Sequence, residues 1–163
     1  MYKAASAFLA ICFVVALLGQ AQAQGQGQDP VVQEIRQLVT SGYRYVTENL
    51  RDETGTYASD GSLEFWSSGG LIQNVQGDEP ARTYESFNLV PKHIRVISLA
   101  EDVAMAQFYV EGSYQETGQA HVDHYFTRAT QVFVNENGEW KIRAAHWSPV
   151  MGGTGTKQTA IVR

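Results

Sequence analysis

The sequence predicts an α+β domain in which a strongly curved, mixed or antiparallel sheet wraps as a cone around one N-terminal helix. Three observations predict this fold. One helix-spaced apolar stripe opens the domain, and everything after residue 61 reads as strand or turn. The strand segments at 103–115 and 120–135 contain 13 and 16 residues. At about 3.3 Å per residue they would extend about 40–50 Å, so they must coil to fit a domain of this size.

The N-terminus has the three parts of a secretory signal peptide: Lys3, a short apolar run, and small residues for cleavage at 21–23. The alternative, a membrane anchor, is disfavoured because the apolar run is too short to cross a hydrocarbon core of about 30 Å. We therefore expect export to the periplasm or the extracellular space, with no membrane attachment after cleavage. The expected division of the chain is a signal peptide at 1–23, a flexible leader at 24–28, the domain at 29–150 and a flexible tail at 151–163.

The helix is expected to begin at Asp29, whose side chain can cap it, followed by Pro30 at the favoured first helical position. An apolar stripe then predicts about five turns. Its members are Val32, Ile35, Leu38, Val39, Gly42, Val46 and Leu50.

Six strand segments are expected, at 62–67, 71–75, 84–99, 103–115, 120–135 and 139–148. The loops at 116–118 and 136–138 each end in glycine, which is typical of three-residue hairpin loops. If both close in this way, even-numbered residues of the last three strands share one face.

The even-numbered face is predicted to form the core, and Gly112 is predicted to be a bend in its strand. The core members are Ala104, Ala106, Phe108, Val110, Val122, Phe126, Thr130, Val132, Val134, Trp140, Ile142 and Ala144. The odd-numbered face mixes aromatic and polar groups, including Tyr109, Tyr125, Gln131, Phe133 and Trp147, and suits a subunit interface. We expect a homodimer or a higher homo-oligomer, with a pocket at the open end of the cone.

The composition argues against several classes of partner. The chain has 12 basic and 17 acidic residues, and no basic stretch tracks a phosphate backbone, so nucleic acid is not expected. Cleavage removes Cys12, the only cysteine. Along a strand, His121 and Asp123 point away from His124. We therefore predict no metal site and no cofactor.

Three segments near the C-terminus carry a family resemblance: Arg128-Ala129-Thr130-Gln131-Val132, Gly138-Glu139-Trp140-Lys141-Ile142 and His146-Trp147-Ser148. Together they resemble the nuclear transport factor 2-like superfamily, above all SnoaL-like domains and the association domain of calcium/calmodulin-dependent protein kinase II. The resemblance implies a cone-shaped α+β domain, usually dimeric or larger, whose cavity serves enzymes in some members and non-catalytic hubs in others. Where the kinase hub has cavity arginines, this chain has Val110, Gln131 and Trp147.

Polar residues on the predicted apolar face are the candidate site. The predicted register places Arg128 opposite His146 and Val110 opposite His124. One interpretation is structural, with Arg128 paired to a carboxylate such as Glu64. The other places Arg128 and His146 at the mouth of the cone. The candidate ligand-binding residues are Arg128, His146, His124, Glu64, Trp66 and Tyr45, of which Arg128 and His146 are also the candidate catalytic residues.

Three functions remain open at this point. The first is an exported domain that binds a small, mostly apolar, oxygen-bearing ligand and dimerises through the outer sheet face. The second is a metal-free isomerase or cyclase in which His146 is the base and Arg128 stabilises an oxyanion. The third is a non-catalytic oligomerisation hub.

Overall fold

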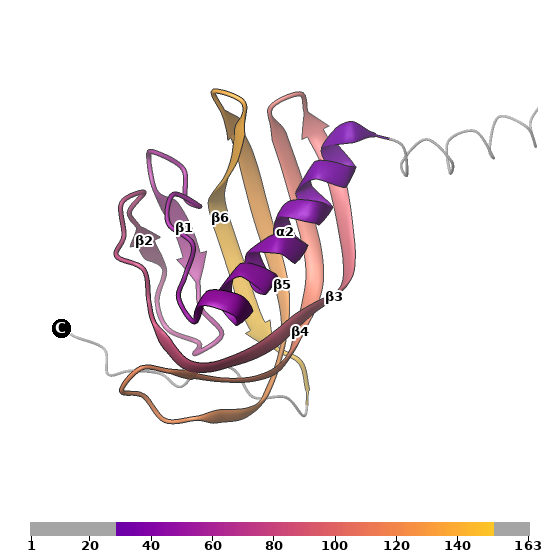
Figure 1. Ribbon diagram of the computed structural model, residues 1–163. Coiled ribbons are helices and arrows are strands. Elements are labelled where there is room, and N and C mark those ends of the chain that lie inside the picture. The colour runs from indigo at the N-terminus through magenta and orange to yellow at the C-terminus, as the bar shows by residue number, and fades with distance from the viewer. Residues whose placement is uncertain (1–28, 152–163) are drawn as a thin grey trace, which may run out of the picture.

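The helix lies diagonally across the concave side of a six-stranded sheet in the computed structural model, which describes residues 29–151 (Figure 1). The predicted signal peptide, the leader and all but the first residue of the predicted tail lie outside the described residues. Within the described part, no helix is both long enough and apolar enough to span a membrane. The elements are α2 (Pro30–Asn49), β1 (Ser62–Phe65), β2 (Gln73–Val75), β3 (Tyr84–Ala100), β4 (Val103–Glu116), β5 (Val122–Glu136) and β6 (Glu139–Pro149).

The helix begins and ends as its sequence dictates. The Asp29 carboxylate accepts a hydrogen bond from the Val31 amide at 2.9 Å, and Pro30 occupies the first turn, where no amide hydrogen is needed. Leu50 ends the helix in a left-handed conformation, with φ at 51°. The buried side of the helix carries Val32, Ile35, Val39 and Val46, all members of the predicted stripe.

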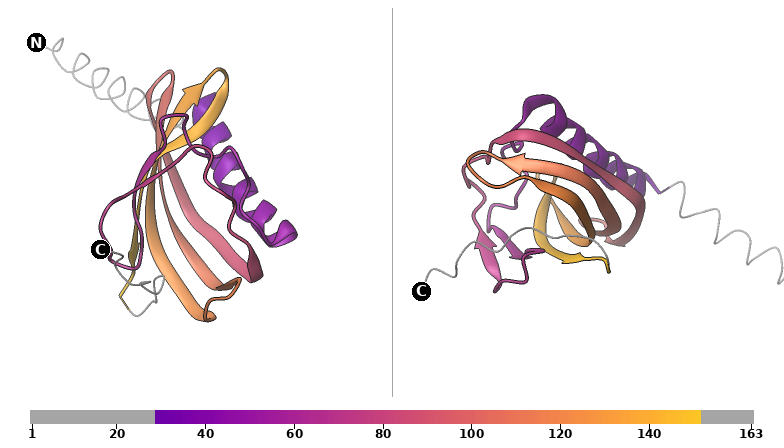
Figure 2. Two further views of the ribbon diagram at one scale, coloured as in Figure 1. Left: turned by 90° about the vertical axis from the view of Figure 1, so that its left-hand side faces the viewer. Right: turned by 90° about the horizontal axis from the view of Figure 1, so that it is seen from below.

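The sheet is mixed and strongly curved. Its strand order is β2-β1-β6-β5-β4-β3, and every neighbouring pair is antiparallel except β1 with β6. Figure 2 shows the sheet curving around the helix, which confirms the predicted cone-shaped α+β fold.

Gly112 is the bend that the sequence predicts. Its φ is 145°, and a Cβ atom added there would lie 1.9 Å from the carbonyl oxygen of Asn88 on β3. The pairing register between β4 and β5 also shifts between Gly112 and Tyr114. Because only glycine adopts this conformation without strain and permits this close approach, Gly112 lets two long strands curve together.

The prediction of one shared even-numbered face is correct for β4 and wrong for most of β5. On β4, Ala104, Ala106, Phe108 and Val110 are buried. Two residues of β5, 123 and 124, oppose the single residue Ser113 of β4, so a bulge moves the odd-numbered side chains inside from Tyr125 onward. The buried β5 residues are Val122, Tyr125, Thr127, Ala129, Gln131 and Phe133.

The last hairpin also differs from the prediction. Glu136 pairs with Glu139, so the loop has two residues, not three. Asn137 and Gly138 have φ of 55° and 90°, as a type I′ turn requires. Further along β6, Arg143 is an extra residue in the register, so the side chains packed on the core change from Trp140 and Ile142 to Ala145 and Trp147.

Candidate functional site

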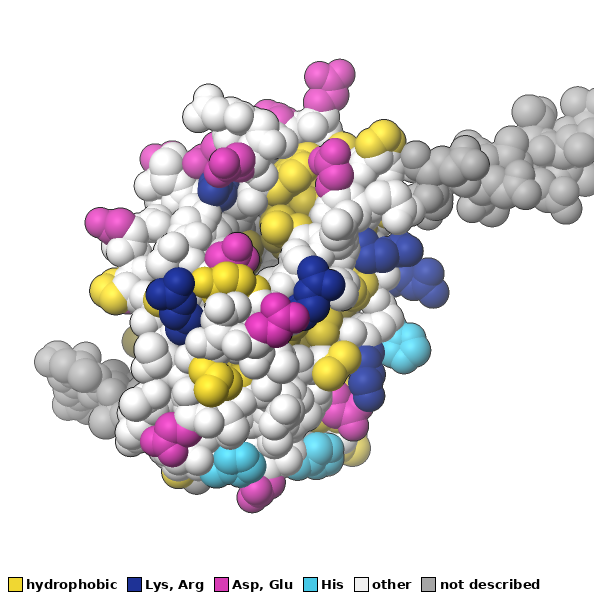
Figure 3. Space-filling model, in the orientation of Figure 1, with side chains coloured by type: hydrophobic (Ala, Val, Ile, Leu, Met, Phe, Trp, Pro, Cys, Tyr) yellow, Lys and Arg dark blue, Asp and Glu magenta, His cyan; other side chains and the backbone are white. Residues whose placement is uncertain are grey.

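A cavity of about 610 Å³ lies between α2, the concave face of the sheet and the segment that follows the helix. In Figure 3, hydrophobic side chains are visible in the centre of this face, surrounded by charged groups. The lining from the helix includes Leu38, Gly42 and Tyr43, and the loops contribute Trp66 and Arg82. The lining from the sheet includes Tyr84, Phe87, Leu89, Tyr114, Tyr125, Gln131, Phe133, Trp140, Ile142 and Trp147. The predicted position of a pocket, at the open end of the cone, agrees with this geometry.

Aromatic rings form most of the cavity wall. Tyr84 contacts Phe87 edge-to-face at 5.0 Å between ring centroids, and Tyr114 contacts Tyr125 in the same way at 5.5 Å. All three tryptophans of the sequence also line the cavity. Rings locked against one another lose little freedom when a ligand binds, so this wall is a preformed apolar surface.

An ion pair braces one side of the cavity. The guanidinium of Arg82 donates to the Asp52 carboxylate at 2.8 Å, and the Tyr84 hydroxyl donates to the same carboxylate at 2.7 Å. Arg82 also lies over the ring of Trp66, 4.7 Å from its centroid. Burial raises the pKa of Tyr84, so its hydroxyl stays protonated and remains a donor.

A second cavity of about 340 Å³ lies on the other side of this ion pair. Both cavities are lined by Asp52, Tyr57, Trp66 and Arg82. Burial is the main cause of the raised pKa of Tyr57, and the nearby Glu64 carboxylate is the second cause. The shared wall is therefore polar, whereas the interior of the larger cavity is mainly apolar.

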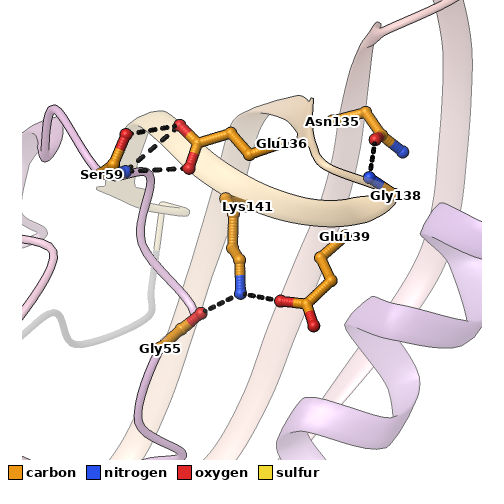
Figure 4. Close-up of polar contacts among 7 residues, drawn as sticks. All are labelled: Gly55, Ser59, Asn135, Glu136, Gly138, Glu139 and Lys141. Atoms are coloured by element: carbon orange, nitrogen blue, oxygen red, sulfur yellow. Dashed lines mark hydrogen bonds and ion pairs between the residues drawn. The ribbon is translucent and has the colours of Figure 1, made fainter.

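Residues 51–61, which we call the rim segment, contribute positions 52–57 to the wall of the larger cavity. The rim segment is hydrogen-bonded to β6 through the Ile142 amide to the Thr56 carbonyl, at 2.8 Å, and through the Ala58 amide to the Ile142 carbonyl, at 2.9 Å. Figure 4 shows the side-chain contacts of the same region: Lys141 donates to the Gly55 carbonyl at 2.7 Å and pairs with Glu139 at 2.6 Å. These contacts hold the rim segment against the hairpin.

Several polar groups on the cavity wall have no hydrogen-bond partner among the described residues, among them the buried indole N–H groups of Trp66 and Trp147. Gln131 is buried on β5, and no donor or acceptor pairs with its amide. The Tyr43 hydroxyl on α2 is also unpartnered, and burial raises its pKa well above the ordinary value, so it stays neutral. A neutral amide and a neutral phenol can each bind an oxygen atom of a ligand.

Arg128, His146 and His124 do not lie in the cavity, which makes their predicted placement wrong. All three are exposed on the convex face. Arg128 pairs across the strands with Ser148, donating to its hydroxyl at 2.8 Å, and the ring of His146 contacts Phe65. The bulges in β5 and β6 are the physical reason, because each moves these side chains to the opposite face. The mechanism built on His146 as base and Arg128 as oxyanion stabiliser therefore has no cavity to act in.

The other predicted residues are closer to the site. Trp66 lines both cavities. Glu64 is only 2% exposed, does not pair with Arg128 and accepts a hydrogen bond from Ser62 at 3.1 Å. Burial raises the pKa of its carboxyl group. Tyr45 accepts a hydrogen bond from Arg51 outside the cavity, and it is Tyr43, two residues earlier, that lines the wall.

Sequence reasoning missed the ion pair of Asp52 and Arg82, which comes from two loops thirty residues apart. It also placed Gln131 on the outer face. Within residues 29–151, no three His, Cys, Asp or Glu side chains are grouped to hold a metal ion. His121 contacts Asp123 at 2.9 Å, while His124 stacks on Phe126.

Comparison with known proteins identifies relatives of this fold. The sequence profile of the SnoaL-like domain matches residues 45–152. No curated protein sequence matches the chain. Among solved structures, an NTF2-like protein from Cytophaga hutchinsonii is 18% identical, with 76% of this chain and 98% of that chain covered and a TM-score of 0.53.

Two further structures are similar. An NTF2-like protein of unknown function from Pseudomonas putida is 18% identical, with 80% and 96% of the two chains covered and a TM-score of 0.50. The association domain of the C. elegans kinase CaMKII is 12% identical, with 78% and 96% covered and a TM-score of 0.42. At these identities the likeness concerns the fold alone.

Proposed function

The chain belongs to the SnoaL-like domain family, and we propose that it binds a small, mostly apolar, uncharged ligand that carries at least one oxygen atom. The observation that carries the proposal is an aromatic cavity of about 610 Å³ with an unpartnered amide, that of Gln131, on its wall. Ligand sites are typically of this size, mainly apolar, with a few polar groups that orient the ligand.

The charges around the cavity favour an uncharged ligand. Five ionisable side chains of fixed charge line it, and four of them pair with each other: Arg82 with Asp52, and Lys141 with Glu139. A carboxylate ligand would therefore have to compete for a cation that already has a partner. An uncharged ligand avoids that cost because it needs no counter-ion.

The unpartnered polar groups favour a ligand oxygen atom. A buried amide that has no hydrogen bond loses the free energy of its hydration, about 1–3 kcal/mol, and a ligand carbonyl or hydroxyl would restore it. Gln131 and Tyr43 lie on β5 and α2, so they present donors from two sides of the same cavity.

A pair of ligands that differ only in oxygen tests this proposal. Thermal-shift measurements would compare 2-acetylnaphthalene with 2-ethylnaphthalene, a hydrocarbon of nearly the same shape. We expect both to stabilise the protein and the ketone to bind about tenfold more tightly, the value of roughly one hydrogen bond. In Gln131→Leu, which keeps the volume and removes the amide, the ketone should lose most of its advantage over the hydrocarbon.

Gly42→Phe is the matched control for the cavity itself. Gly42 lines the cavity and a Cβ atom there has nothing within 4 Å, so we expect the ring of a phenylalanine at this position to occupy cavity space. Neither ligand should bind this variant, although it should fold. Binding that survives Gly42→Phe would place the ligand elsewhere and reject the proposal.

We also propose that a second copy packs on the convex face of the sheet. Leu63, Phe65 and Tyr109 are each more than 40% exposed there, and Tyr109 contacts Phe126. The bulge in β5 gives this face Phe126 and Arg128 in place of the predicted Tyr125 and Gln131. Native mass spectrometry should find a dimer or larger assembly, and Phe65→Glu should dissociate it. A monomeric wild-type protein would contradict this assignment.

Export is the last part of the proposal and rests on residues 1–23 of the sequence. Expression with the full N-terminus should give an exported protein whose first residue is Gln24. A product that stays inside the cell with residues 1–23 attached would refute export.

A further inference from the structure

A surface notch lies between α2 and the edge strand β3. Its volume is about 330 Å³, and it is lined by Arg36, Thr40, Pro91, His93, Ile94 and Arg95. None of these residues lines the larger cavity or the second one. The notch therefore needs an explanation of its own.

Three nitrogen-rich side chains surround the notch without an acidic partner. In the part of the chain that the structure describes, the side chains of Arg36, His93 and Arg95 make no hydrogen bond and no ion pair. The neighbouring Lys92 is different because it pairs with Glu111. Figure 3 shows Lys, Arg and His side chains gathered along the edge of the molecule on the side where β3 lies. This local excess of positive charge contrasts with the net charge of −5 for the whole chain.

The backbone at the notch is shaped in an unusual way. Lys92 pairs with Tyr109 and Arg95 pairs with Gln107, so His93 and Ile94 together oppose one residue of β4. This is a β-bulge, and His93 within it has a φ of 55°, a left-handed conformation that few residues other than glycine adopt. The bulge changes which side chains of β3 face outward and leaves Arg95 exposed beside Arg36. Backbone conformations of this kind occur often at functional positions.

We propose that the notch binds a tetrahedral oxyanion, the phosphate or sulfate group of a ligand, between the guanidinium groups of Arg36 and Arg95. The planar guanidinium groups of Arg36 and Arg95 can each donate two hydrogen bonds to such a group, and the His93 ring supplies a further donor. No carboxylate lines the notch to compete with the anion. The site is independent of the proposed cavity ligand, which is uncharged and binds elsewhere.

Nuclear magnetic resonance titrations of the wild-type protein test this site. Inorganic phosphate and phenyl phosphate would be added separately, with sodium chloride at matched ionic strength as the reference. We expect saturable shifts of the amide signals of residues 93–95 and of the Arg36 side chain, with a dissociation constant on the order of 1 mM. Shifts with inorganic phosphate alone indicate a free anion, and shifts with both indicate that an ester is also accepted. Either result supports oxyanion binding at the notch.

The double variant Arg36→Gln with Arg95→Gln should weaken phosphate binding at least about tenfold, because both guanidinium groups are lost. The matched control is Arg44→Gln, an exposed arginine on the same helix that does not line the notch. It should leave binding unchanged. Both variants change exposed side chains, so both should fold. Shifts that do not saturate, that equal those in sodium chloride, or that persist in the double variant would overturn the proposal.

Discussion

Replacing Gly112 with alanine tests how the sheet is able to curve. The new Cβ atom would lie 1.9 Å from the Asn88 carbonyl oxygen and 3.2 Å from the Leu89 Cα atom, so the β3 backbone must move. The φ of 145° adds strain of about 1–3 kcal/mol. Overpacking adds about 1–3 kcal/mol. The sum is about 2–6 kcal/mol, a large part of the stability of a typical domain.

The effect reaches the cavity because of what Gly112 pairs with. Its cross-strand partners are Leu89 on β3 and Tyr125 on β5, and both line the cavity. We therefore expect Gly112→Ala to reduce both the free energy of unfolding and the binding of any cavity ligand.

Urea unfolding, monitored by tryptophan fluorescence, measures the change in the free energy of unfolding, with Gly118→Ala as the matched control. Gly118 also has a positive φ, 76°, but a Cβ atom there has nothing within 4 Å. The control should therefore lose only about 1 kcal/mol, the cost of the left-handed conformation. If the two variants lose equal stability, the close approach to Asn88 is not what requires glycine, and the reasoning fails.

Three further substitutions have expected effects on stability. Gly42→Ala should raise the free energy of unfolding by about 0.5–1 kcal/mol, because alanine favours a helix interior and its Cβ atom has nothing within 4 Å. A lower free energy of unfolding in chemical denaturation would contradict this. Asp52→Asn should lower the free energy of unfolding by about 1–2 kcal/mol, because Arg82 loses its counter-charge. An unchanged unfolding midpoint would show that this ion pair does not stabilise the protein. Glu64→Gln should stabilise the protein near pH 7 and less so near pH 4. Burial raises the folded pKa of Glu64 above the unfolded value, so wild-type stability falls as pH rises through that window. A benefit that does not change with pH would refute this reason.

The sequence predicts the parts of the fold that depend on local chemistry. Four features follow from residues close together in the sequence: the cap at Asp29, the apolar stripe of the helix, the inner face of β4 and the bend at Gly112. The family resemblance drawn from the last two strands is also confirmed. These features do not depend on the exact pairing of distant strands.

The site could not be predicted in the same way because it depends on register. The Asn137-Gly138 turn has two residues, and single-residue bulges in β5 and β6 reverse which side chains point inward. A shift of one residue exchanges the two faces of a strand, so Gln131 enters the cavity and Arg128 leaves it. The pair of Asp52 and Arg82 joins two loops, and no periodic pattern marks such a contact.

The indole N–H signals of the protein test the central claim most directly. The sequence has three tryptophans, Trp66, Trp140 and Trp147, and all three line the cavity. On titration with 2-acetylnaphthalene, all three signals should shift and saturate together, and none should shift in Gly42→Phe. The ketone could instead bind while the indole signals stay in place and the backbone amide signals of convex-face residues, such as His146, move. In that case the cavity is not the binding site.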